Sequence, residues 1–467
     1  PREGWPQSVD FTQPPPSKQN LIEFGFFASP TLYDLDGDGD LEVLAPAMDQ
    51  NLYVWHADGS RFAPYPVKVG SDPEQGARII ASVAVGDADG DGKAEIAVGT
   101  SETFGAAGNA NETLAYLLES ETGEIADGWP ASLYGLTVET LPIVGRGVVS
   151  NPIMADLDYD GTLELSFDTI SSPGVLLNHD GTQYRKMDNK DYGPLSDSQD
   201  SPAYILHNHG AMGNIDGKGG IDLVKGTAGF DFAIAFAGGG ERKPFDHHMS
   251  GWDTDTGKMM EGFPRVHDDW QFFNTPTIVD INNDNKPEVI IGSGGYLVRA
   301  WNYLGEEPPG WPKQTGGWII ASAGVGDFDG DGNFDVTVMT RDGWLYAWKT
   351  EGKAGQSLFE WNGFNHDPHN TGNYETSPTP YKTWSGEVVA PEPEPEPEPS
   401  DAQGTDDGDE TTDVGPTPST DATDEGATPE PEDEGGCSAT NTRTLPLALM
   451  GLMLMVSWLL RRRQVVG

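Results

Sequence analysis

Carboxylates recur at every second position in several nine-residue stretches of this sequence. In residues 34–42, DLDGDGDLE, an acid fills positions 1, 3, 5, 7 and 9, and glycine fills positions 4 and 6. Carboxylates held this close together at neutral pH repel one another. A chain that repeats such a stretch needs something to offset that repulsion.

The acidic stretch occurs six times, and we name the copies acid loops one to six in chain order. Their ranges are 34–42, 87–95, 156–164, 214–222, 280–288 and 327–335. Successive copies start 53, 69, 58, 66 and 47 residues apart. This period is typical of propeller blades joined by loops of variable length.

The spacing within a loop favours a divalent cation bound by oxygen. Oxygens at positions 1, 3 and 5 of a tight turn converge, glycine at position 6 permits the bend, position 7 offers its backbone carbonyl, and the acid at position 9 closes the site. Calcium takes six to eight oxygens at ~2.3–2.6 Å, whereas magnesium demands a tighter octahedron and zinc prefers His and Cys. The sequence therefore predicts calcium, about five ions in all. The predicted ligand positions are Asp34, Asp36, Asp38, Asp40, Glu42, Asp87, Asp89, Asp91, Lys93, Glu95, Asp156, Asp158, Asp160, Thr162, Glu164, Asp280, Asn282, Asp284, Lys286, Glu288, Asp327, Asp329, Asp331, Asn333 and Asp335.

The six acid loops differ in the metal-ligating side chains that they offer. Loop five has Asn282 at position 3, and because an amide oxygen is an acceptable ligand we expect this loop to bind. Loop four has Asn214 at position 1 and Lys218 at position 5. An ammonium there stands where an oxygen is needed, so we expect Lys218 to replace the ion with a fixed charge.

Trp residues and aromatic-Pro pairs outside the acid loops repeat together with the loops. Trp55, Trp301 and Trp348 each follow position 9 of their loop by thirteen residues. Aromatic-Pro pairs come later in several units, at residues 5–6, 65–66, 129–130, 263–264 and 311–312. Short apolar runs flank each loop, so each unit is predicted to have four short strands with the acid loop between the first two and the Trp packed between blades. The predicted fold is all-β, a β-propeller of about six, alternatively seven, four-stranded blades.

The two ends of the repeat region are predicted to close the ring. Residues 3–10, EGWPQSVD, resemble a final strand without the rest of its blade and are expected to complete the last blade. Residues 359–374 are the expected C-terminal closure, in which His366, Asp367 and His369 have a structural role.

The acid loops resemble those of FG-GAP or VCBS repeats, which build β-propellers such as the N-terminal propeller of integrin α subunits. The resemblance covers about residues 34–374 and rests mainly on the pattern D-x-D-x-D-G-x-x-[DE]. It implies calcium bound between the first two strands of a blade, and adhesion or ligand recognition at a cell surface. Such repeats also occur attached to enzymes.

Composition divides the chain into three regions: a propeller over residues 1–380, a stalk over 381–436, and an anchor segment over 437–463. The stalk begins with PEPEPEPEP at 391–399, expected to be extended polyproline II, and continues with residues that have little to bury. The formal net charge of −48 makes nucleic acid an unsuitable partner. An unknown surface protein or glycan is expected instead.

The C-terminal segment predicts attachment to a membrane. Residues 445–460 are apolar apart from Ser457, and Arg461–Arg463 would stay on the cytoplasmic side. Cys437, the only cysteine, precedes this segment after two glycines. Together these features resemble the C-terminal sorting signal of myxobacterial surface proteins, which implies processing near Cys437 and display at the cell surface or outer membrane.

No catalytic motif stands out. The sequence has no nucleophile elbow, P-loop or zinc-protease helix. Four histidines near loop four, at 207, 209, 247 and 248, are a weak candidate cluster. We therefore expect a binding protein, with a propeller-type polysaccharide lyase, or a non-catalytic part of a larger secreted enzyme, as the alternative.

Overall fold

A computed structural model describes residues 2–10, 25–70, 78–102, 112–134, 147–170, 172–188, 192–205, 208–231, 246–271 and 273–379. Within these ranges the chain is almost entirely strand and turn, in six antiparallel sheets. The predicted stalk and anchor, with Cys437, lie outside the described residues. In the part of the chain that is described, no helix is long and apolar enough to cross a membrane.

Three sheets have the simple order of a four-stranded blade. Blade one consists of β1 (Thr31–Tyr33), β2 (Glu42–Pro46), β3 (Asn51–Trp55) and β4 (Val67–Lys68). Blade two consists of β5 (Ala84–Gly86), β6 (Glu95–Gly99), β7 (Glu112–Glu119) and β8 (Ala131–Tyr134). Blade three consists of β9 (Ile153–Ala155), β10 (Glu164–Thr169), β11 (Ser172–Leu177) and β12 (Gln183–Lys186).

The other three sheets vary this plan. Blade four has β14 (Gly210–Gly213), β15 (Asp222–Gly229), β16 (His247–Asp253) and β17 (Lys258–Met259), with β13 (Pro202–Tyr204) on β15 and β18 (Arg265–His267) on β16. Blade five has β19 (Thr277–Val279), β20 (Glu288–Gly292), β21 (Leu297–Trp301) and β22 (Lys313–Gln314), and β26 (Phe359–Trp361) adds to its β19 edge. Blade six has three strands among the described residues, β23 (Gly324–Gly326), β24 (Asn333–Met339) and β25 (Leu345–Lys353).

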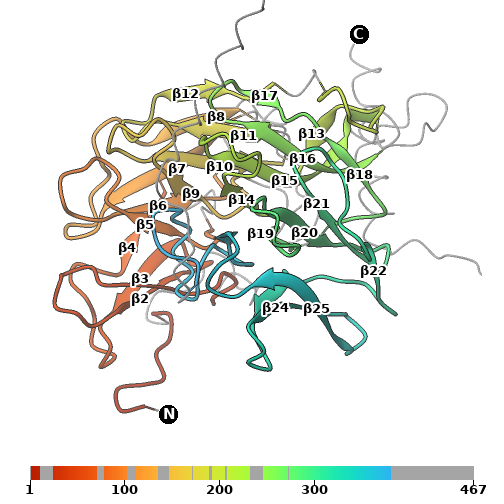
Figure 1. Ribbon diagram of the computed structural model, residues 1–467. Coiled ribbons are helices and arrows are strands. Elements are labelled where there is room, and N and C mark those ends of the chain that lie inside the picture. The colour runs from red at the N-terminus through yellow and green to blue at the C-terminus, as the bar shows by residue number, and fades with distance from the viewer. Residues whose placement is uncertain are drawn as a thin grey trace, which may run out of the picture.

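The predicted propeller of about six blades is confirmed, and so is the place of the acid loops. Each loop joins the first and second strands of its blade, as between β1 and β2. The six sheets surround a central segment, blue in Figure 1. Because the loops occupy the same turn of every blade, they all lie at the same end of the propeller.

Apolar residues between neighbouring sheets form the core. Leu44 and Val54 of blade one pack in one buried cluster with Val85 and Ile96 of blade two. Trp301 is almost fully buried in a cluster with Trp252 of blade four, and half-buried Trp348 packs against the cluster between blades five and six, as predicted for the Trp residues. Trp55 is also almost fully buried, but it packs with Trp5 and Val9 of the N-terminal residues and not between two blades.

Residues 2–10, which were expected to complete the last blade, pair with no strand of blade six among the described residues. They pack on blade one instead: Trp5 Nε1 donates to Ala57 O (3.1 Å), and Gln7 Nε2 donates to Gly59 O (2.9 Å). Trp129 of blade two docks on blade three in the same way, through Nε1 to His179 O (2.7 Å). Residues 2–10 thus occupy the place of an outer strand before blade one, with no pairing to blade six among the described contacts.

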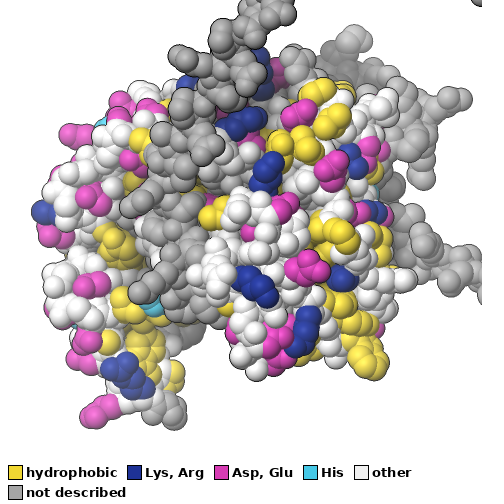
Figure 2. All heavy atoms as spheres, viewed as in Figure 1, with side chains coloured by type: hydrophobic (Ala, Val, Ile, Leu, Met, Phe, Trp, Pro, Cys, Tyr) yellow, Lys and Arg dark blue, Asp and Glu magenta, His cyan; other side chains and the backbone are white. Residues whose placement is uncertain are grey.

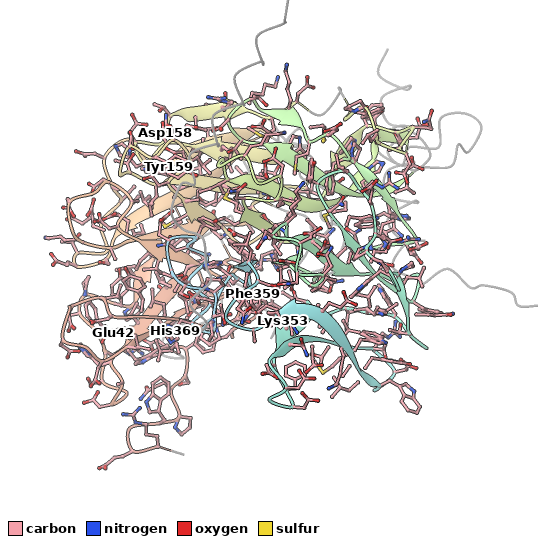
Figure 3. The ribbon with its side chains drawn as sticks, viewed as in Figure 1. Glu42, Asp158, Tyr159, Lys353, Phe359 and His369 are labelled. Carbon is pink, nitrogen blue, oxygen red and sulfur yellow. The ribbon has the colours of Figure 1, made fainter. Side chains whose placement is uncertain are left out.

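The expected C-terminal closure is instead an axial segment, which we define as residues 358–379. It makes backbone hydrogen bonds to the innermost strands of several blades. His369 O accepts from Leu32 N (2.8 Å), Thr371 O from Val85 N (2.9 Å) and Gly372 O from Met154 N (2.9 Å). Since β26 also pairs with β19, one segment ties together blades one, two, three and five. Phe359 and His369 are labelled within it in Figure 3.

Side chains of the axial segment complete this connection. Asp367, buried, accepts from His369 N (2.8 Å), Thr371 N (3.2 Å), Thr371 Oγ1 (2.7 Å) and Thr376 Oγ1 (2.6 Å). His366 is fully buried, and its Nε2 lies 2.6 Å from Thr376 O. These contacts agree with the structural role expected for His366 and Asp367.

Candidate metal centres

Two residues with a left-handed backbone conformation shape each acid loop. In loop one, φ is +74° at Gly37 and +91° at Gly39, positions 4 and 6. Positions 4 and 6 have positive φ in all six loops, although Tyr159 takes position 4 in loop three and asparagines take both positions in loop five. Glycine at position 6 was predicted; the same requirement at position 4 was missed, although glycine stands there in four of the loops.

The carboxylate at position 1 is oriented by the loop backbone. Asp34 accepts from Gly37 N (2.8 Å) and Gly39 N (3.0 Å). Asp327 in loop six accepts in the same way from Gly330 N (2.8 Å) and Gly332 N (2.9 Å). The repeated geometry shows that the loop itself holds the first predicted ligand in place.

Positions 5 and 7 are linked by a similar bond. Asp91 Oδ1 accepts from Lys93 N (2.8 Å), and Asp160 Oδ1 accepts from Thr162 N (2.9 Å). This bond uses the N–H of position 7 and not its carbonyl, which is the predicted ligand.

The acid at position 9, which we call the closing acid, is buried and half satisfied. One of its oxygens accepts the position 2 N–H in every loop, at 2.9 Å for Glu42 and 2.7 Å for Glu95. The corresponding distances are 2.8, 2.9, 3.0 and 3.1 Å in loops three to six. The second oxygen faces the loop: in Glu95 it has no hydrogen-bond partner among the described residues, whereas in loops one and five it contacts a side-chain nitrogen.

Four loops bring three or more donor residues together, with the donor atoms of each group within 4.8 Å of one another. The groups are Asp34, Asp36 and Asp38, and also Asp36, Glu42 and His56, in loop one; Asp87, Asp89 and Glu95 in loop two; Asp156, Asp158 and Glu164 in loop three; and Asp327, Asp329 and Asp335 in loop six. Figure 3 labels Glu42 of loop one and Asp158 of loop three. Convergence of positions 1, 3 and 9 is thus present in loops two, three and six, and that of positions 1, 3 and 5 in loop one.

Loop two has the least compensated charge. Glu95 is 2% exposed, and neither its Oε1 nor the buried Oδ1 of Asp87 has a hydrogen-bond partner. Burial, with smaller contributions from the neighbouring Asp89 and Glu119 carboxylates, raises the pKa of Glu95 to about 8. An ionised carboxylate in such a place is costly unless a cation compensates it.

Burial raises the pKa of other closing acids in the same way. The pKa of Glu164 rises to about 7 and that of Glu288 to about 8, in each case chiefly through burial. The pKa of Asp222 in loop four also lies well above its usual value because of burial. Burial therefore shifts Glu164, Glu288 and Asp222 toward the protonated form in the absence of an ion, and a bound divalent cation would favour loss of that proton.

Loops four and five differ from the other loops in the contacts of their side chains. Lys218 Nζ lies 2.8 Å from Asp216 Oδ2, so the lysine pairs with the position 3 carboxylate. In loop five, Asn282 Nδ2 donates to Glu288 Oε1 (2.8 Å), and Asp280 accepts from Asn285 N (3.0 Å). With Asn282 at position 3, loop five keeps carboxylates at positions 1, 5 and 9.

Two basic side chains at the loops were missed in the sequence. His56 Nδ1 lies 3.1 Å from Glu42 Oε1, and Lys349 Nζ lies 2.6 Å from Asp329 Oδ2 and 2.7 Å from Asp331 Oδ2. Each follows the Trp of its third strand by one residue and its closing acid by fourteen. That constant offset was the signal that could have found them.

The histidines near loop four do not form a metal group among the described residues. His209 Nδ1 accepts from Asn151 N (3.0 Å), His248 Nε2 lies 2.7 Å from Ser198 Oγ, and His247 stacks edge-on to Trp270. These contacts are those of packed interior residues. His207 lies outside the described residues.

Acidic side chains are spread over the visible face of the molecule, with Lys and Arg between them (Figure 2). The described part of this face has no continuous basic surface of the kind that phosphate backbones require.

Comparison with known families agrees with the loop geometry. The FG-GAP-like repeat family matches residues 34–98 and 280–338, and the FG-GAP repeat family matches residues 80–117. The chain contains FG-GAP repeats. The matched ranges include acid loops one, two, five and six. No curated protein sequence matches this FG-GAP-repeat chain.

Several solved structures resemble it at low identity. A quinohemoprotein alcohol dehydrogenase from Comamonas testosteroni has a TM-score of 0.45 and 14% identity, covering 70% of this chain and 60% of its own. The V. cholerae biofilm matrix protein Bap1 has a TM-score of 0.41 and 12% identity, covering 74% of this chain and 55% of its own. BBS1N, crystallised in complex with ARL6DN, has a TM-score of 0.40 and 14% identity, covering 69% of this chain and 79% of its own.

Proposed function

We propose that this FG-GAP-repeat propeller binds calcium in its acid loops and recognises a ligand in adhesion at the cell surface. The observation that carries the proposal is the same carboxylate cluster at the same turn of several blades. A propeller of FG-GAP repeats is suited to ligand recognition or adhesion. The partner is a protein or glycan of another surface.

Calcium fits the donor set of the loops. The groups in loops two, three and six contain carboxylate oxygens alone, which a hard cation prefers over the nitrogen and sulfur that zinc selects. The unpartnered oxygens of Asp87 and Glu95 add two acceptors that such an ion would satisfy. A bound ion neutralises the clustered charge and links the first two strands of its blade. We assign about five ions, to loops one, two, three, five and six.

Display requires the C-terminal regions. We propose that the protein is exported, that residues 381–436 form a stalk, and that residues 437–463 attach it to the membrane or direct its sorting. Cys437 is then the processing site. Intact-mass analysis of the surface-released protein tests this, because processing near Cys437 removes Arg461–Arg463 from the displayed molecule.

Calcium dependence is tested by thermal unfolding of the full chain in excess calcium and in chelator. Ligands that bind only the native state raise the melting temperature, by RT ln(1 + [L]/Kd) in free energy for each site. We expect a clear fall in chelator, and an unchanged midpoint would refute the calcium assignment. Magnesium in place of calcium is the control for ion identity.

Recognition is tested by screening the full chain on glycan and surface-protein arrays with and without calcium. Calcium-dependent binding without bond cleavage supports a recognition protein. Release of unsaturated sugars from acidic polysaccharides, followed by ultraviolet absorbance, would instead identify a lyase.

A further inference from the structure

The third strand of each blade places one residue opposite the closing acid, and its charge differs from blade to blade. The strand register pairs Glu95 with Glu119, Asp222 with Asp253, and Asp335 with Lys349. In blade one the same position brings His56 to Glu42. We call this position the facing residue. It is His56, Glu119, Asn178, Asp253, Asn302 and Lys349 in loops one to six.

In loop six the facing residue occupies the carboxylates that an ion needs. The ammonium of Lys349 contacts Asp329 at 2.6 Å and Asp331 at 2.7 Å, and these are positions 3 and 5. A divalent ion must displace the ammonium from this pair. The side chain of Lys349 is 62% exposed, so it can move into solvent when an ion enters.

In loop two the facing residue has the opposite charge. Glu119 faces Glu95, whose Oε1 is buried without a hydrogen-bond partner. The lysine of this loop pairs with Glu121, outside the predicted ligands, and affects Asp91 and Glu119 only through its charge (Lys93 Nζ to Glu121 Oε2, 2.6 Å). Loop two therefore places a facing carboxylate beside a closing acid that has no ammonium in contact with it among the described residues.

The remaining intact loops lie between these extremes. Asn178 Nδ2 donates to Thr182 Oγ1 (2.8 Å), and Asn302 Oδ1 accepts from Leu304 N (3.0 Å). Both amides thus form hydrogen bonds within the turn that follows their strand, and neither adds charge to its acid loop. His56 contacts one oxygen of Glu42. Loop four has Lys218 within the loop itself.

We propose that the facing residue sets the order in which the acid loops take up calcium, with loop two filling first and loop six last. This ordering rests on the proposed calcium binding. A unit charge about 6 Å from a divalent ion changes its binding constant by about tenfold even in the dielectric of water. Glu119 and Lys349 differ by two charges, so loops two and six should differ in affinity by about a hundredfold.

The test is a calcium titration of the full chain, with ions per chain counted by native mass spectrometry. Asp89→Ala and Asp329→Ala each remove a position 3 ligand and identify which ions belong to loops two and six. Lys349→Met should tighten binding of the last ion by about tenfold, and Glu119→Gln should weaken binding of the first ion by a similar factor. Lys93→Met is the matched control for the last ion, since it removes a lysine from loop two and should leave calcium binding at loop six unchanged.

The outcomes separate the two proposals. The proposed order is wrong if Lys349→Met leaves the affinity for the last calcium ion unchanged, or if Lys93→Met changes that affinity by the same factor. The number of ions counted would in either case still support calcium binding. A wild-type chain that takes up no ions overturns both. Since Lys349 and Lys93 are exposed, circular dichroism of these variants should match the wild type.

Discussion

Replacing Asp367 with alanine should weaken the whole propeller. Its buried carboxylate accepts four hydrogen bonds inside the axial segment, and that segment holds the inner strands of four blades. Loss of the carboxylate should therefore lower the stability of the whole propeller and not only of the turn in which Asp367 lies.

The expected cost follows from the donors left behind. The hydroxyls of Thr371 and Thr376 have other partners, since Thr376 Oγ1 also lies 2.7 Å from Asn373 O and 2.9 Å from Thr371 Oγ1. The N–H groups of His369 and Thr371 lose their acceptor. Thr371 is buried, whereas His369 is exposed and water can take the place of its acceptor. At roughly 1–3 kcal/mol for one buried unsatisfied donor, Asp367→Ala should lower the free energy of unfolding by about 2 kcal/mol.

Urea unfolding in excess calcium, followed by Trp fluorescence, measures this change. Asp58→Ala is the control, because Asp58 is an exposed turn residue that accepts Ser60 N (2.8 Å), and its loss should cost under about 1 kcal/mol. Asp367→Asn keeps one acceptor oxygen and should fall between the two. If Asp367→Ala costs no more than Asp58→Ala, the axial segment does not hold the blades together.

Three further predictions concern other parts of the propeller. Lys225 and Asp168 form a buried ion pair between blades four and three, so Lys225→Met should cost about 3–5 kcal/mol and the double variant with Asp168→Leu less, as measured by urea unfolding. Asp36→Ala should lose one calcium ion by native mass spectrometry and Lys218→Ala none; an ion held by loop four would show that the assignment of Lys218 is wrong. Burial lowers the pKa of His366 to about 4, below its unfolded value, so its neutral form stabilises the fold and this contribution is lost as pH falls from 6.5 to 4. Between pH 7 and pH 5 the loss should be about 2 kcal/mol, and a His366→Gln variant with the same pH dependence as the wild type would contradict it.

The sequence by itself determined the features that are local. The acid loops could be found because their geometry is built within nine residues: Asp34 accepts from the backbone three and five residues later, and the closing acid reaches back seven residues to position 2. Their period, and the Trp at a fixed offset, then specified a blade of paired strands. The defect of loop four was visible for the same reason, because Lys218 and its partner Asp216 are two residues apart.

Only the tertiary structure decided which distant residues meet. Strand pairing brings His56 and Lys349 to loops that lie fourteen residues earlier in the chain, and nothing within the nonapeptides specifies them. Ring formation brings Asn370 O within 3.0 Å of Thr31 Oγ1, a contact across 339 residues that no local pattern encodes. Residues 359–374 were recognised as a closing element, yet their place on the axis depends on unpaired groups of inner strands that exist only once the blades surround them.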